Sequence, residues 1–124
     1  MTKKLEIYKC EICGNIVEVL EEAGGTLVCC GKPMVLQKEN SIDAAKEKHV
    51  PVLTSNNEGV EINVGSVPHP MTQEHYIQWI EIQTENECSR KNLLPGQEPK
   101  AFFPVKAKVI WVRISCNLHG LWKD

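Results

Sequence analysis

The sequence predicts an all-β protein in which a small, metal-bound N-terminal unit precedes an immunoglobulin-like antiparallel β-sandwich or barrel. Three observations predict this organisation. Short apolar segments separated by turn signals recur along the chain, as they do in antiparallel β-domains. The sequence shows no long amphipathic helical pattern and no internal repeat. Four of the six cysteines lie within the first thirty residues, whereas all four histidines follow them.

The N-terminal region has the pattern of a small strand-rich unit built around cysteines. Short strands are expected at Leu5–Tyr8, Ile16–Leu20 and Met34–Leu36. Residues 10–15 form a tight turn between the first two strands, and Gly14 supplies the positive φ that such a turn needs. A unit of this size is too short to build its own core, so we expect a metal to hold it together.

The second region is predicted to consist of strands that follow a polar connection. Gln37–Lys48 is rich in charged residues, and Asp43–Lys46 within it is expected to form one helical turn. We therefore expect two domains, 1–37 and 38–124. Pro95–Pro99 is an evident loop. The expected strands of the second domain are Val50–Thr54, Val60–Val64, Tyr76–Gln83, Ala101–Ala107 and Val109–Ser115.

The composition argues against several functional classes. The chain has 124 residues, of which 42% are hydrophobic and 24% charged, as in ordinary globular domains. Its 14 Lys and Arg against 16 Asp and Glu give a net charge of −2, which argues against a nucleic-acid partner. No apolar run reaches the ~20 residues that span a bilayer. Glu6 and Lys9 interrupt the apolar stretch that a signal peptide needs. We therefore expect a cytoplasmic protein that binds no membrane.

The N-terminal cysteines predict a metal site made of sulfur ligands only. Cys10 and Cys13 place two sulfurs on one turn, and Cys29 and Cys30 supply a second pair. Four thiolates form a tetrahedral site, which suits both structural zinc and a single iron, so this geometry leaves the metal open. Disulfides would need an oxidising compartment. The alternatives to a metal site are four unligated thiols or a disulfide between Cys29 and Cys30.

The histidines and one distant cysteine predict a second metal site. His69 and His75 lie six residues apart, and prolines flank His69 on both sides. Cys116 and His119 form a C-x-x-H turn, a compact unit of two ligands. His49 follows a charged run at the start of the second domain. Each histidine taken alone is more simply a core or surface residue, and it is their number and setting that favour a common site.

The remaining cysteine and the aromatic residues are assigned no part in the chemistry. Cys88 has no partner at ligand spacing and is expected to be an unligated thiol. Packing in the core or at its rim is expected for Trp79, Trp111, Trp122 and the pair Phe102-Phe103.

These motifs resemble two known kinds of protein, one over the cysteine segments and one over essentially the full chain. The cysteine segments resemble desulforedoxin, a small protein with one iron held by four cysteines, and this likeness favours iron over zinc. Those segments are Cys10-Glu11-Ile12-Cys13-Gly14-Asn15 and Val28-Cys29-Cys30-Gly31. Essentially the full chain resembles the desulfoferrodoxin family of two-iron superoxide reductases. That likeness is carried by Ala44-Ala45-Lys46-Glu47-Lys48-His49-Val50-Pro51, Val64-Gly65-Ser66-Val67-Pro68-His69-Pro70-Met71 and Cys116-Asn117-Leu118-His119-Gly120.

The resemblance implies two iron ions per chain and a role for each matching residue. The first iron would be bound by the four N-terminal cysteines. The second would have four equatorial nitrogens, an axial sulfur and a sixth position that is empty in the ferrous state. Its implied ligands are His49, His69, His75, His119 and Cys116. Glu47 would match a carboxylate that can occupy the sixth position after oxidation, and Lys48 a positive charge beside the substrate path.

The implied activity is the one-electron reduction of superoxide to hydrogen peroxide without production of dioxygen. An open iron position would let the anion bind directly, and the thiolate opposite it would favour release of peroxide. The implied partners are a rubredoxin-like electron donor and a second copy of the chain in a homodimer. One departure is visible: members of the family often carry Glu-Tyr before the ligand cysteine, where this chain has Ile114-Ser115, which affects how the thiolate is tuned.

Two other functional classes compete with this hypothesis. A blue-copper electron carrier also uses Cys and His on a β-sandwich, but it usually has an axial Met shortly after the histidine. Only Gly-Leu-Trp-Lys-Asp follows His119. A zinc-stabilised interaction module would use the four-cysteine unit and leave the histidines incidental. Metal analysis with an absorption spectrum separates the three classes.

Overall fold

Nearly all of the regular structure is β-strand. The structure is a computed structural model that describes residues 1–40 and 46–124. The chain divides into two units, Met1–Lys38 and Glu39–Asp124. In the described ranges the only helix is a single turn, α1 (Lys46–His49), so the all-β prediction is confirmed. None of the helical structure in those ranges has the length and apolar character to cross a bilayer.

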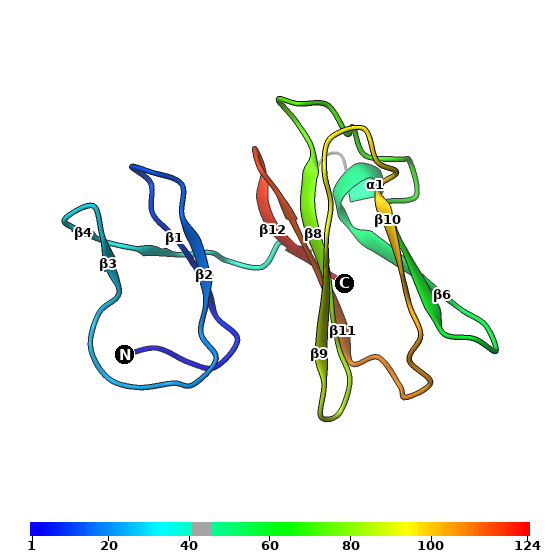
Figure 1. The fold of residues 1–124 in the computed structure, drawn as a ribbon, viewed down its shortest axis with the longest axis horizontal. Coiled ribbons are helices and arrows are strands. Elements are labelled where there is room, and N and C mark those ends of the chain that lie inside the picture. The colour runs from blue at the N-terminus through cyan, green and yellow to red at the C-terminus, as the bar shows by residue number, and fades with distance from the viewer. Residues whose placement is uncertain (41–45) are drawn as a thin grey trace. The chain divides into compact units, whose positions relative to one another are not determined.

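Short strands form the N-terminal unit (Figure 1, blue to cyan). In one antiparallel sheet β1 (Ile7–Lys9) lies between β2 (Ile16–Glu18) and β5 (Val35–Leu36). A second, two-stranded sheet pairs β3 (Val28–Cys29) with β4 (Lys32–Pro33). β1, β2 and β5 overlap the three predicted strands but are shorter, whereas β3 and β4 were not predicted.

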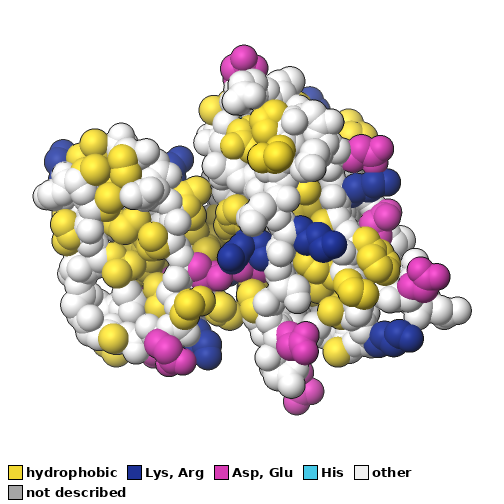
Figure 2. Space-filling model, in the orientation of Figure 1, with side chains coloured by type: hydrophobic (Ala, Val, Ile, Leu, Met, Phe, Trp, Pro, Cys, Tyr) yellow, Lys and Arg dark blue, Asp and Glu magenta, His cyan; other side chains and the backbone are white. Residues whose placement is uncertain are grey.

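Few apolar side chains are buried in this unit. Ile7 and Val19 are covered, together with the side chain of Cys10. Apolar side chains that remain exposed are more numerous, and they gather on its surface in Figure 2. The exposed apolar residues of this unit are Met1, Ile12, Val17, Leu20, Val28, Val35 and Leu36. Because so little apolar area is removed from water, this unit has a weak core of its own.

The second unit contains two antiparallel sheets that share one core (Figure 1, green to red). The smaller sheet has the order β10-β7-β6, made of β6 (Pro51–Ser55), β7 (Val60–Val64) and β10 (Lys100–Phe103). The larger has the order β12-β11-β8-β9, made of β8 (Ile77–Gln83), β9 (Cys88–Asn92), β11 (Trp111–Cys116) and β12 (Gly120–Lys123).

The core of this unit is formed by alternate side chains of the facing strands. Along β7 the buried residues Val60, Ile62 and Val64 alternate with half-buried polar ones, as expected for a strand with one face inward. The opposite sheet contributes Ile77, Ile80, Ile82, Val112 and Ile114. This packing confirms the predicted sandwich.

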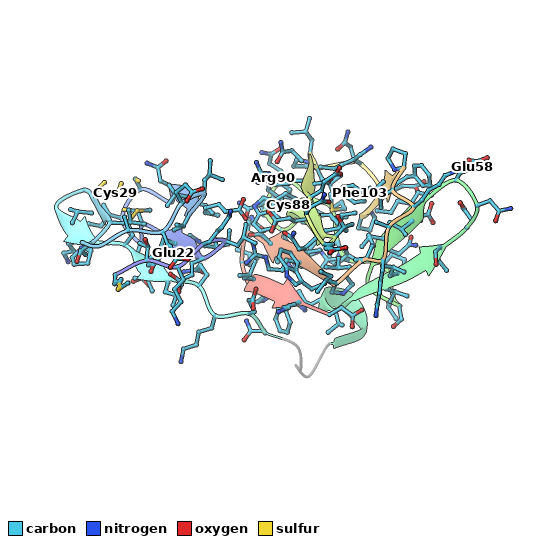
Figure 3. The ribbon with its side chains drawn as sticks, turned by 90° about the horizontal axis from the view of Figure 1, so that it is seen from below. Glu22, Cys29, Glu58, Cys88, Arg90 and Phe103 are labelled. Carbon is cyan, nitrogen blue, oxygen red and sulfur yellow. The ribbon has the colours of Figure 1, made fainter. Side chains whose placement is uncertain are left out.

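One predicted strand ends early, and two further strands were not predicted. The strand expected at Ala101–Ala107 ends at Phe103, because Pro104 has no N–H for the sheet and the Val105 N–H turns back to the Phe103 carbonyl at 2.8 Å. The sequence did not predict β9, which is a polar edge strand, or β12, which begins directly after the C-x-x-H turn. Figure 3 labels Cys88, which is exposed, and Arg90 on β9.

The predicted connection is partly built into the second unit. Asn40 forms a parallel bridge with Trp122: its N–H donates to the Leu121 carbonyl at 2.9 Å, and its own carbonyl accepts from the Lys123 N–H at 2.8 Å. The chain is therefore anchored to β12 before it reaches α1. Of the helical turn expected at Asp43–Lys46, residues 43–45 lie outside the described part of the chain.

Candidate metal centres

The four N-terminal cysteines come together at two turns. Cys10 and Cys13 lie in the turn after β1, where Gly14 has a φ of 86°, as predicted. Cys29 ends β3 and Cys30 follows at a φ of 53°. This left-handed backbone, which a cysteine rarely adopts, continues into Gly31. It reverses the chain within two residues, and this reversal allows two adjacent sulfurs to face one point.

The sulfur positions fit a tetrahedral ion. All four Sγ atoms lie within 4.8 Å of one another. The Sγ atoms of Cys13 and Cys29 are 3.5 Å apart, and those of Cys29 and Cys30 are 3.9 Å apart. Sulfurs bound tetrahedrally at ~2.3 Å are ~3.8 Å apart, whereas a disulfide is ~2.05 Å long. The spacing therefore fits four thiolates around one metal, and Figure 3 shows the sulfur atoms gathered beside Cys29.

The thiols of this cluster differ in how easily they ionise. Backbone N–H groups of Cys13 and Ile12 hold the pKa of Cys10 down to about 6. The neighbouring sulfurs of Cys13 and Cys10 raise the pKa of Cys30 to about 12. Repulsion thus opposes four thiolates at neutral pH, and a bound cation is what would allow all four to lose their protons.

Weak hydrogen bonds to sulfur complete this site. The Cys13 N–H donates to the Sγ of Cys10 at 3.5 Å, and the amide Nδ2 of Asn15 lies 3.6 Å from the Sγ of Cys29. Such donors stabilise negative charge on thiolate ligands.

The four histidines form a closed square in the second unit. Adjacent ring centroids are 4.9 Å apart for His49 and His69, 4.6 Å for His69 and His75, 5.0 Å for His75 and His119, and 4.9 Å for His119 and His49. Adjacent rings are inclined by 65° to 85°. Four imidazoles set edge to face in this way can direct one nitrogen each toward a common centre.

Cys116 adds a sulfur to this group. Ligand atoms of Cys116, His49, His75 and His119 all lie within 4.8 Å of one another, and the ring of His69 completes the square. The Sγ of Cys116 is 3.8 Å from Nδ1 of His119, which in turn is 3.0 Å from Nε2 of His49. The pairing of β11 with β8 shifts register between Ser115 and Cys116, an irregularity of the kind that redirects a side chain.

Two unsatisfied nitrogens show that this group fits a metal ion. Nε2 of His69 and Nε2 of His75 are buried and have no hydrogen-bond partner within the described residues. The other nitrogen of His69, Nδ1, lies 2.7 Å from the Pro70 carbonyl oxygen and would donate to it, which leaves Nε2 with its lone pair. Buried polar atoms rarely lack a partner, and a cation at the centre of the square would supply one.

Burial also favours the neutral form of His69 and His75. Loss of hydration lowers the pKa of His69 to about 4, and burial followed by the positive charge of neighbouring histidines lowers the pKa of His75. Neutral imidazole is the form that binds metals. Burial raises the pKa of the Cys116 thiol, while backbone N–H groups of Leu118 and His119 act in the opposite direction and would stabilise a metal-bound thiolate.

The second site is open on one side. His69, His49 and Cys116 are 3%, 5% and 2% exposed, whereas His119 reaches the surface. Lys48 is exposed, and its positive charge adds slightly to the lowering of the His75 pKa. The side chain of Glu47 lies outside the described part of the structure.

Asn117 is a site residue to which the sequence analysis assigned no role. Its Oδ1 accepts the N–H of Tyr76 at 2.9 Å, and its Nδ2 donates to the Glu74 carbonyl at 2.9 Å. These bonds tie the segment that carries His75 to the turn that carries Cys116. Ser115, one of the two residues that differ from the family pattern before the ligand cysteine, donates its hydroxyl to Oε1 of Gln78 at 2.8 Å.

Comparison with known proteins identifies relatives of both units. The profile described as desulfoferrodoxin, N-terminal domain, matches residues 2–37, and the profile described as desulfoferrodoxin matches residues 41–124. A desulfoferrodoxin of Syntrophotalea carbinolica is 57% identical over 100% of this chain and 98% of its own length. A superoxide reductase of Pyrococcus abyssi is 38% identical over 63% of this chain and 84% of its own length. The crystal structure of the superoxide reductase from Treponema pallidum superposes with a TM-score of 0.83 at 28% identity, covering 99% of both chains.

Proposed function

The chain belongs to the desulfoferrodoxin family and is a superoxide reductase, and we propose that it reduces superoxide at an iron held in the square of four histidines. The two donor sets match the two-iron pattern of this family. The observation that carries the assignment is the square itself, closed by four rings with a buried sulfur beside it. The proposed ligands are His49, His69, His75, His119 and Cys116.

The reaction consumes one electron and two protons for each superoxide and yields hydrogen peroxide. A ferrous ion in this site would supply the electron and a position at which an anion can bind. The ligand residues would set the charge and the electron density of that ion. Neutral imidazoles leave the iron with the positive charge that attracts the anion, and the thiolate of Cys116 donates electron density from within the core.

Two charged residues next to His49 are proposed to act on the substrate side. Lys48 would attract superoxide and stabilise the charge that it adds to the site; its exposure and its electrostatic effect on His75 support this role. Glu47 is proposed, from the family resemblance, as the carboxylate that occupies the open position after oxidation.

We propose that the electrons come from a rubredoxin-like donor that docks over the exposed edge of the site. Leu118 lies between Cys116 and His119 in the chain and is 59% exposed, so it offers an apolar contact next to two ligands. Leu118→Glu should slow electron transfer from reduced rubredoxin. The matched control is Ile110→Glu, because Ile110 is also 59% exposed but precedes the other end of β11. Equal rates for the two variants would place the donor elsewhere.

We propose that residues 1–37 form a desulforedoxin-like domain whose four-cysteine iron supports the fold, and that residues 38–124 form the catalytic domain. The apolar surface of the first domain, which includes Val17, Leu20 and Val28, is the proposed contact of a homodimer. A cytoplasmic location is proposed as well, because a reducing compartment keeps closely spaced cysteine thiols available as metal ligands.

The test uses the purified full chain. Metal analysis should find two irons per chain, and the absorption spectrum should show distinct bands for the two centres. The reduced protein mixed with superoxide should produce one peroxide per superoxide and no dioxygen. One copper, or zinc in both sites, would contradict the assignment, and release of dioxygen would indicate dismutation instead of reduction. His75→Ala is the matched control, since it should lose the second iron and the reaction while it keeps the first iron.

A further inference from the structure

We propose that Trp122 is a positioning residue that holds the rings of His49 and His119 in the geometry that binds the second iron. The sequence assigned this tryptophan to packing alone. In the structure it contacts two of the proposed ligand residues through different parts of its side chain.

The first contact is with the ring of His49. The two rings stack with centroids 4.7 Å apart and planes inclined by 16°. His49 belongs to α1, a helix of only four residues, and one helical turn has little stability of its own. The orientation of the His49 ring must therefore come from its packing, and a stacked indole restricts its rotation.

The second contact is with the backbone of His119. The indole Nε1–H donates to the His119 carbonyl at 3.1 Å. This carbonyl lies in the turn between β11 and β12, so the bond fixes the turn that carries both His119 and Cys116. The Trp122 side chain thus fixes His49 and His119, which are neighbours in the square, relative to each other.

Trp122 is itself held firmly. It is 5% exposed and lies on β12, where it pairs with Ile114 of β11. On the other side of β12, Asn40 bonds to the backbone of Leu121 and Lys123, the residues on either side of Trp122. Asn40 precedes α1 by only a few residues in the sequence. The chain is therefore bound to β12 shortly before it reaches His49.

A positioning role differs from simple packing in what it changes. Loss of packing lowers the unfolding temperature, whereas loss of positioning changes the metal site in the folded protein. The proposal rests on the proposed function, because it assumes that His49 and His119 are ligands of the second iron. A wild-type chain that binds no second iron would contradict that function.

The experiment compares two substitutions of Trp122 with one control. Trp122→Leu removes both contacts, and Trp122→Phe keeps a ring that can stack but loses the N–H donor. Trp111→Phe is the control, since Trp111 lies on the adjacent strand and stacks on the Arg113 guanidinium instead of a histidine. The readouts are the rate at which the second iron is lost to a chelator and the electron paramagnetic resonance spectrum of that centre when oxidised.

Trp122→Leu should lose the second iron about 10-fold faster, the lower end of the range measured for residues that orient metal ligands. Trp122→Phe should fall between Trp122→Leu and the wild type, and both should show an altered resonance spectrum. Trp111→Phe should match the wild type, and the first iron should be unaffected in every variant. Wild-type iron loss and an unchanged spectrum in both Trp122 variants would overturn the proposal. The same result in Trp122→Phe alone would overturn it where Trp122→Leu does not fold.

Discussion

The two metal sites of this chain are built on opposite principles. The cysteine site uses ligands that lie between positions 10 and 30, on turns of a unit that buries few apolar side chains. The histidine site uses ligands that lie between positions 49 and 119 and meet at the edge of a well-packed sandwich. The first site therefore depends on its metal for structure, whereas the second is organised by the fold before the metal binds.

The pattern of burial supports this difference. Three of the four N-terminal cysteines are at least partly exposed, and the positive φ of Cys30 is an unfavourable conformation without a ligand to hold it. In the second unit, by contrast, Cys116, His49 and His69 are almost fully covered by neighbouring side chains. A preorganised site of this kind loses little of its geometry when the ion leaves.

The largest effect that would test this comparison is loss of the first iron. Cys13→Ser removes one of four ligands, so we expect the N-terminal unit to lose its structure while the sandwich stays folded. Hydrogen exchange read by mass spectrometry should show full loss of protection for β1 and β2 and unchanged protection for β8 and β11. The matched variant His75→Ala should leave both units protected. Persistent protection of β1 in Cys13→Ser would show that this unit folds without its metal.

The second expected effect is spectroscopic and concerns the sulfur of the second site. Cys116→Ser should abolish the intense thiolate-to-iron band of the oxidised second centre, because the hydroxyl is a much weaker electron donor. The band of the first centre should remain as an internal control. A second-centre band of wild-type position and intensity in Cys116→Ser would show that another residue provides the sulfur.

A smaller effect is expected for Lys48. Lys48→Ala should lower the second-order rate constant for superoxide about 10-fold at low salt and flatten its dependence on ionic strength, because a steering charge is lost. The control is Lys108→Ala. Lys108 is also exposed, but it precedes the first residue of β11, whereas Cys116 is the last residue of that strand. The same rate and salt dependence in both variants would remove the steering role of Lys48.

The smallest effect concerns acid stability of the iron-free sandwich. The pKa of His69 is about 4 in the folded chain, against an ordinary value of 6.5, and that of His75 is also lowered. As the pH falls from 6.5 toward 4, the unfolded chain takes up protons that the folded chain does not. The contribution of these two histidines to the free energy of unfolding should therefore be constant above about pH 6.5 and decrease below it.

Urea unfolding of the iron-free protein at pH 7.5 and 5.0 measures this decrease. Tryptophan fluorescence reports the sandwich alone, because all three tryptophans lie in the second unit. His69→Leu should show a smaller difference between the two pH values. Equal unfolding free energies of the wild type at both pH values would show that these histidines are not buried in the folded apoprotein.

Much of this architecture could be predicted from the sequence, since cysteine spacing and strand alternation are local signals. Most strands of the core and the four-cysteine group were predicted for this reason, whereas the full histidine group, whose members lie up to 70 residues apart, was implied only by the resemblance to a known family. β9 was missed because Cys88-Ser-Arg-Lys-Asn has the polar composition of a loop, and an edge strand needs little apolar character. The positions of Asn117 and Trp122 could not be predicted, because their partners are 41 residues away in the first case and on a separate helix in the second.

The amide of Asn117 has a consequence for the lifetime of the protein. It joins two ligand-bearing segments by accepting one hydrogen bond and donating another. Spontaneous deamidation would convert it to a carboxylate, which can still accept from Tyr76 but would face the Glu74 carbonyl as one acceptor against another. Replacement of the amide NH2 group by an oxygen would thus remove one of the two hydrogen bonds that hold the loop of His75 to the turn of Cys116.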